Sequence, residues 1–154
     1  MGNCCFIDIN EQKLQEIELK DNSVKLFSFN GLKCKARIID VYDGDTFTAC
    51  FMHKDEIIKV KCRCSGYDSP EMKPLLSDPN RDKIKELAVK AKERFCELIK
   101  FNKPKQLVDL QCYEFEKYGR LLCDVYVDKI HINAMMLKEG HGKPYSGGTK
   151  DQFI

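Results

Sequence analysis

Several features that would point to a particular class of protein are scarce or absent in this sequence. It has only three histidines, and His53, His131 and His141 share no spacing that is typical of a metal site. No run of residues is long and apolar enough to span a bilayer. The sequence also lacks a secretory signal, which would combine a charged segment, an apolar stretch and a cleavage site. We therefore expect an intracellular, cytoplasmic protein without a transmembrane segment.

The sequence also lacks a strong excess of charge of one sign. The chain of 154 residues has a formal net charge of +2, with 43% hydrophobic and 32% charged residues. This length allows one proper hydrophobic core but not two. Residues 1–31 carry three lysines against five acidic residues, so the remainder is modestly basic. We expect an N-terminal extension over residues 1–31 and one folded domain over residues 32–154.

The nine cysteines are numerous for a protein without a secretory signal. Disulfides persist in oxidising compartments, and an odd number of cysteines also fits free thiols. Cys62 and Cys64 are too close for a zinc knuckle and would lie on the same face of a strand. We interpret most of the cysteines as small buried hydrophobic residues in a reducing compartment.

The N-terminus carries candidate sites for lipid modification. Gly2 is a candidate for myristoylation after removal of the methionine, and Cys4 or Cys5 for palmitoylation. Two acyl chains would attach the protein stably to a membrane surface. Phe6, however, stands where the usual myristoylation signal has serine or threonine. Peripheral membrane association through acylation and an ordinary N-terminus therefore both stay open.

Alternating apolar residues predict five strands. Asp43-Gly44 is typical of a tight turn between the first two strands. In the third strand, Arg63 would project on the side opposite Cys62 and Cys64. The predicted strands comprise residues 34–42, 46–52, 56–67, 106–115 and 121–127.

Helical periodicity predicts two or three helices. Apolar residues recur at helical spacing from Ile84 to Ile99, after a start signal at Ser77-Asp78-Pro79. A shorter helix is expected over residues 133–139, and Leu14, Ile17 and Leu19 mark a further short one. The order of elements predicts an α+β protein: a five-stranded Greek-key barrel of the oligonucleotide-binding (OB-fold) type, decorated with helices.

Three separated motifs carry complementary chemistry. Asp43-Gly44-Asp45-Thr46 supplies carboxylates at a hairpin tip, and the run from Arg63 to Glu71 adds an arginine, Asp68 and Glu71 around the rigid Pro70. Lys117-Tyr118-Gly119-Arg120 adds a second arginine. Carboxylate oxygens suit calcium or magnesium, and the guanidinium fork can hold two phosphate oxygens. Together these motifs favour metal-assisted cleavage of a phosphodiester.

In this order, D-G-D-T, R-x4-D-S-P-E and E-K-Y-G-R resemble the staphylococcal (thermonuclease-type) nuclease family over roughly residues 33–145. The resemblance implies a hydrolase, acting internally or from an end, that cuts DNA and RNA and leaves 3′-phosphate ends. It assigns calcium to Asp45, Asp68 and the main-chain carbonyl of Ser69, and magnesium, which oxygen ligands also suit, is the alternative. It assigns the attacking water to Glu71, as general base or orienter, and the phosphate to Arg63 and Arg120.

The resemblance further implies that Lys117, Tyr118 and Tyr145 line a nucleotide pocket. Ser69 replaces the threonine of the best-known members, and Glu116 replaces the aspartate that commonly opens the K-Y-G-R turn. We expect Glu116 to affect the geometry of the turn more than catalysis. A non-catalytic nucleic-acid-binding module and a membrane-tethered interaction protein are the alternatives to an enzyme. A monomer is the expected state.

Overall fold

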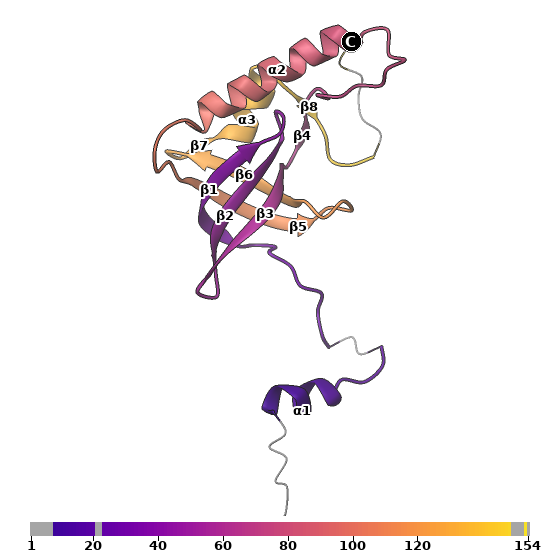
Figure 1. Cartoon of the computed structure of the whole chain (residues 1–154), viewed down its shortest axis with the longest axis vertical. Coiled ribbons are helices and arrows are strands. Elements are labelled where there is room, and N and C mark those ends of the chain that lie inside the picture. Colours follow the sequence, from indigo (N-terminus) through magenta and orange to yellow (C-terminus); the bar gives the residue numbers. More distant parts are fainter. Residues whose placement is uncertain (1–7, 21–22, 149–152, 154) are drawn as a thin grey trace, which may run out of the picture.

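The computed structural model describes residues 8–20, 23–148 and 153, and its main body is a closed β-barrel (Figure 1). The barrel strands are β1 (Lys33–Val41), β2 (Thr46–His53), β3 (Glu56–Cys64), β5 (Val108–Phe115) and β6 (Leu121–Val127). They pair in the order β3-β2-β1-β5-β6, and a parallel pairing between β3 and β6 closes the barrel. The predicted α+β class and five-stranded OB-type barrel are confirmed.

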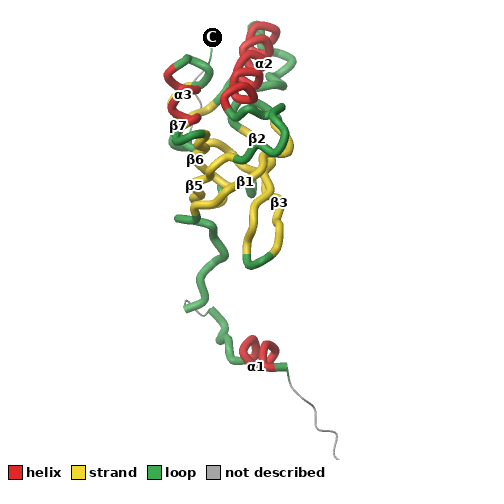
Figure 2. Tube along the Cα trace, turned by 90° about the vertical axis from the view of Figure 1, so that its left-hand side faces the viewer, coloured by secondary structure: helices red, strands yellow, loops and turns green. Residues whose placement is uncertain are grey.

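Helices and short strands complete the fold. The helices are α1 (Ile9–Gln15), α2 (Arg81–Leu98) and α3 (Ile132–Lys138), and the short strands are β4 (Tyr67–Asp68), β7 (Ile130–His131) and β8 (Lys143–Pro144). Figure 2 shows α2 and α3 together at one end of the barrel, with α1 apart from it at the opposite end. In the described residues, no helix is both long and apolar enough to cross a membrane.

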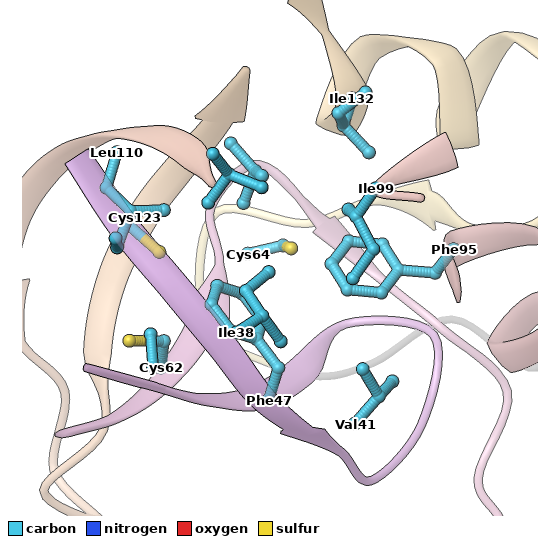
Figure 3. Packing of buried hydrophobic residues seen from close by; sticks show 14 of the residues in the cluster. Ile38, Val41, Phe47, Cys62, Cys64, Phe95, Ile99, Leu110, Cys123 and Ile132 are labelled. Atoms are coloured by element: carbon cyan, nitrogen blue, oxygen red, sulfur yellow. The ribbon is translucent and has the colours of Figure 1, made fainter. Parts of the chain in front are cut away.

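The hydrophobic core fills the barrel and continues beneath α2 (Figure 3). Cys62 and Cys64 point inward from β3 and are fully buried, as expected for small apolar residues. The Phe47 ring from β2 lies 5.6 Å from the Phe95 ring of α2, measured between centroids. This contact fixes α2 against the end of the barrel from which the D-G-D-T turn projects.

Two predicted elements differ from the structure. The third strand does not run to Tyr67 but ends at Cys64, because Gly66 takes a φ of 82° that interrupts the extended backbone. Tyr67 therefore begins the separate strand β4 and is fully buried. Near the N-terminus, the helix spans Ile9–Gln15, so Ile17 and Leu19 lie beyond its end.

Candidate active site

The turn between β1 and β2 is held by its own first carboxylate. Asp43 Oδ1 accepts hydrogen bonds from the backbone N–H groups of Asp45 at 3.0 Å and Thr46 at 2.7 Å. These bonds define the turn and orient Asp45 inward, where it is 1% exposed. Burial, and then the charge of Asp45, raise the pKa of Asp43 to about 6.

Gly44 is required in this turn by close packing rather than by an unusual backbone angle. A Cβ atom at this position would lie 2.9 Å from the Cβ atoms of Ala91 in α2 and Ser69 after β4. The Gly44 carbonyl also accepts a hydrogen bond of 2.6 Å from the Tyr67 hydroxyl. The turn, the helix and the segment after β4 thus meet with no room for a side chain.

The segment after β4 brings the second carboxylate to the same place. Asp68 is 3% exposed, and the backbone N–H of the next residue, Ser69, donates to Asp45 Oδ2 at 2.8 Å. Pairing of β4 with β8 and a bond of 3.0 Å from the Tyr145 N–H to the Gly66 carbonyl fix this corner from the other side. Asp45 and Asp68, 23 residues apart in sequence, are therefore neighbours in the fold.

Arg63 joins the two carboxylates. Its Nη1 donates to Asp45 Oδ1 at 3.0 Å and its Nη2 donates to Asp68 Oδ1 at 2.6 Å. All three side chains are at most 7% exposed. Buried carboxylates cost free energy unless a cation compensates them, so the guanidinium is the electrostatic partner that this cluster needs.

Arg120 reaches the cluster through a hydroxyl group. Its Nη1 donates to Thr46 Oγ1 at 3.1 Å, and that hydroxyl donates to Asp45 Oδ1 at 2.8 Å. Its Nε donates to Glu116 Oε1 at 2.9 Å, so both ends of the turn before β6 are linked by an ion pair. Glu116 thus holds the arginine itself, beyond the effect on turn geometry that the sequence suggested.

Glu71 lies outside the buried cluster. It follows Pro70, which is buried, and its own side chain is exposed. The structure therefore brings Asp45, Asp68, Ser69 and Arg63 into direct contact but leaves Glu71 on the surface.

A pocket of about 560 Å³ adjoins Arg63. The Tyr145 ring forms one wall, with its centroid 5.6 Å from the Arg63 guanidinium carbon. Lys117 also lines this pocket. Tyr118 does not line it; this residue is 72% exposed, and its ring centroid lies 4.9 Å from the Lys117 ammonium. The lining residues are Arg63, Cys64, Ser65, Gly66, Tyr67, Glu116, Lys117, Leu122, Tyr145, Ser146, Gly147 and Gly148.

A hydrogen-bond network supports the corner that carries this pocket. Buried Asn133 donates to the carbonyls of Ser65 at 3.0 Å and Cys123 at 3.1 Å, and it accepts from the Val125 N–H at 3.0 Å. Asp124 accepts hydrogen bonds from the hydroxyl of Ser65 and from Asn133. No sequence motif predicted these contacts, because they join segments that are distant along the chain.

The donor types around Arg63 suit a hard divalent cation. Asp45 and Asp68 offer carboxylate oxygens, and the buried Ser69 hydroxyl beside them has no hydrogen-bond partner in the described residues. Over the described part of the chain, no three or more His, Cys, Asp or Glu side chains are grouped to hold a metal. Calcium, which takes six to eight oxygens, would therefore also need main-chain, water or phosphate oxygens.

The closed barrel and its acid and guanidinium cluster define an OB-type protein with a candidate phosphodiester site. Residues 61–152 match the model of the family described as "Staphylococcal nuclease homologue", which is more than half of the chain. The chain belongs to this family, whose members are usually nucleases and generally depend on calcium. The match includes Arg63, Asp68 and Arg120 but begins after Asp45. No curated protein matches the chain.

Proposed function

We propose that the chain is a calcium-dependent nuclease that hydrolyses DNA and RNA to 3′-phosphate ends. The observation that carries the proposal is the convergence of Asp45 and Asp68 on Arg63 within one buried cluster. Two carboxylates share this one guanidinium, and all three side chains are nearly buried, where unlike at the surface the second carboxylate is not compensated by water. The excess negative charge and the oxygen donors favour the presence of a cation at this place.

The side chains would divide the reaction between them. A bound calcium ion would supply positive charge that favours attack on the phosphate. Arg63 and Arg120 would donate hydrogen bonds to the non-bridging phosphate oxygens, most strongly in the transition state. Glu71 would orient the water or accept its proton as the new P–O bond forms. The bond between phosphorus and the 5′ oxygen would then break, the leaving 5′ oxygen would take up a proton from water, and the phosphate would stay on the 3′ oxygen.

The pocket beside Arg63 would hold the nucleotide next to the scissile bond. The Tyr145 ring offers a flat apolar surface to a base, and Lys117 offers a positive charge to a neighbouring phosphate. Tyr118 lies beside both Lys117 and Arg120, with its centroid 5.8 Å from the Arg120 guanidinium carbon. We propose that it contacts the substrate outside the pocket.

One assay separates this function from its alternatives. Purified protein is incubated with single-stranded DNA, duplex DNA and RNA in calcium, in magnesium and in chelator. We expect calcium-dependent cleavage that Glu71→Gln abolishes and that Glu93→Gln, a matched change of an exposed glutamate on α2, leaves intact. Tight binding without cleavage would instead support a non-catalytic module, and neither activity would favour an interaction protein.

The N-terminal assignments stay proposals of their own. Gly2, Cys4 and Cys5 lie outside the described residues, and we propose acylation there as the means of peripheral membrane association. Mass spectrometry of the N-terminal peptide from native cells tests this directly, since unmodified Gly2, Cys4 and Cys5 would rule out the anchor. We likewise propose a cytoplasmic monomer, and sedimentation of the purified protein tests the oligomeric state.

A further inference from the structure

A line of basic side chains follows the outer face of β3 toward the candidate active site. Lys59, Lys61 and Arg63 occupy alternate positions of this strand, so all three project away from the core that Cys62 and Cys64 enter. Lys59 and Lys61 are exposed, whereas Arg63 is 6% exposed within the acid cluster. The line thus runs from open surface to the buried guanidinium.

The strands beside β3 extend this basic surface. On β2, Cys50 pairs with Lys59 and also with Arg37 of β1, so the two basic residues flank Cys50 on the same face. Thr48 pairs with Lys61 on one side and with Asp40 on the other, which places a single acid in this part of the face. We call Arg37, Lys59 and Lys61 the β3 basic track.

The three track residues have no acidic partner within the described part of the chain, in contrast to some other basic residues. Lys35 on the neighbouring part of the barrel is paired with Asp109 at 2.7 Å, and Lys100 with Asp128 at 2.6 Å. Within the described residues, none of the three track residues forms an ion pair. Their charges are therefore available to an external anion.

We propose that the β3 basic track binds consecutive phosphates of a single-stranded nucleic acid whose scissile phosphate lies at Arg63. This inference rests on the proposed nuclease function and extends it to the form of the substrate. Successive outward residues on a strand are separated by about 6.6 Å, a spacing comparable with that of phosphates along an extended single strand. Lys59 and Lys61 can therefore meet two consecutive phosphates, and Arg37 on β1 can add a contact from across β2.

The enclosure of the site favours a single strand over a duplex. A phosphate must reach Arg63, which is nearly buried, while the adjoining base enters the pocket walled by Tyr145. A base can do so only after leaving a duplex stack, which costs free energy that an unpaired strand does not incur.

The test compares binding by two double variants. Lys59→Gln/Lys61→Gln removes two track charges, and Lys103→Gln/Lys105→Gln removes two exposed charges with the same spacing from the loop after α2. Both are made in the Glu71→Gln background so that a substrate stays intact. Binding of a single strand of about 12 nucleotides and of a dinucleotide is measured across a salt series.

For the longer strand, we expect the track variant to lose about tenfold in affinity at low salt and to lower the slope of log K against log salt by about 1.4. Dinucleotide binding and the loop variant should be unchanged, because neither involves the track. Equal salt slopes for the track variant and the loop variant would overturn the proposal. So would a duplex that binds as tightly as the single strand and loses the same affinity in the track variant. Failure of the wild type to cleave would refute the nuclease function alone, since the binding comparison needs no cleavage.

Discussion

Arg63 has both a structural role and a proposed chemical role. It is the cation that compensates Asp45 and Asp68 in the folded chain, and it is the candidate donor to the substrate phosphate. These two parts are compatible only if another cation compensates the carboxylates when phosphate is bound. The double use of Arg63 is therefore itself an argument for a metal-dependent reaction.

Replacement of Arg63 by lysine should separate the effect of the planar guanidinium from the effect of its positive charge. Lys keeps the positive charge but cannot span Asp45 and Asp68 with a planar fork, so we expect turnover to fall about 100- to 1,000-fold, as for loss of one preorganised donor. Single-turnover cleavage in saturating calcium measures this, with circular dichroism to confirm that the variant is folded.

A surface arginine in the same kind of contact serves as the control. Arg94 also bridges two acids, donating to Glu139 at 2.6 Å and Glu97 at 2.9 Å, but it lies at the surface. Arg94→Lys should leave turnover within about twofold, because exposed ion pairs contribute little. Equal losses in the two variants would show that Arg63 has no special place in the reaction.

At the scale of single residues, the sequence predicted which side chains have suitable chemistry. It predicted less well the hydrogen bonds that hold these side chains in place. The motifs pointed to Asp45, Asp68, Arg63 and Arg120, and the fold places these in one network. Their proposed catalytic roles still await experiment. The hydroxyl of Thr46, which connects Arg120 to Asp45, could not be foreseen, because it depends on the register of strands that are remote in sequence.

At the scale of elements, the short helix α3 supports the corner between β3 and β4. Asn133, in its first turn, bonds to backbone groups of β6 and of the corner between β3 and β4. That corner leads into Tyr67 and Asp68. The helix therefore supports the pocket through Ser65, and it supports Asp68 through the same corner.

Replacement of Asn133 by alanine should weaken this support. The buried Val125 N–H and the part-buried Ser65 carbonyl would lose their partner, and we expect a loss of about 2 to 3 kcal/mol in unfolding free energy. Urea unfolding followed by fluorescence or circular dichroism measures it. Asn102→Ala, in an exposed position after α2, should change stability by less than about 0.5 kcal/mol. A similar small change for Asn133→Ala would contradict the supporting role.

Periodicity identified the long elements and missed the short ones. Strand alternation and the helical repeat in α2 extend over enough residues to be recognised, whereas β4, β7 and β8 contain two residues each. The break at Gly66 was also missed, because a lone glycine in an alternating run is compatible with a continuous strand. That break is what turns Asp68 toward Asp45.

At the scale of the whole molecule, the barrel includes a residue that precedes its first strand. Phe29 is 5% exposed, belongs to the core and lies 5.5 Å from Phe51, measured between ring centroids. Phe27, two residues earlier, is 63% exposed. The predicted division into residues 1–31 and 32–154 is still untested, and these two rings offer a direct test of it.

Phe29→Ala should destabilise the protein by about 3 to 5 kcal/mol, since it leaves a cavity in the core. Phe27→Ala should cost less than about 1 kcal/mol, because most of its ring is already in water. Thermal or urea unfolding of the two variants measures the difference. A stability unaffected by Phe29→Ala would support the boundary at residues 31 and 32, and a large loss would extend the domain toward the N-terminus.

The barrel as a whole could be predicted because its strand order and the three motifs point to the same fold. Its closure could not be predicted from local pattern alone. The parallel pairing of β3 with β6 joins residues 62–64 to residues 121–123, and no turn or periodic signal links them. Such a contact is specified only by the packing of the entire core.

The barrel closes between strands that are far apart in sequence, so the order of synthesis determines when the site can be complete. Translation releases the chain from its N-terminus, so Asp45 and Arg63 leave the ribosome long before Arg120 and β6. Until β6 lies beside β3, the second arginine is absent from the cluster and the pocket lacks a wall. If the proposed function holds, we expect the nascent chain to be unable to cut RNA near the ribosome until β6 has joined β3.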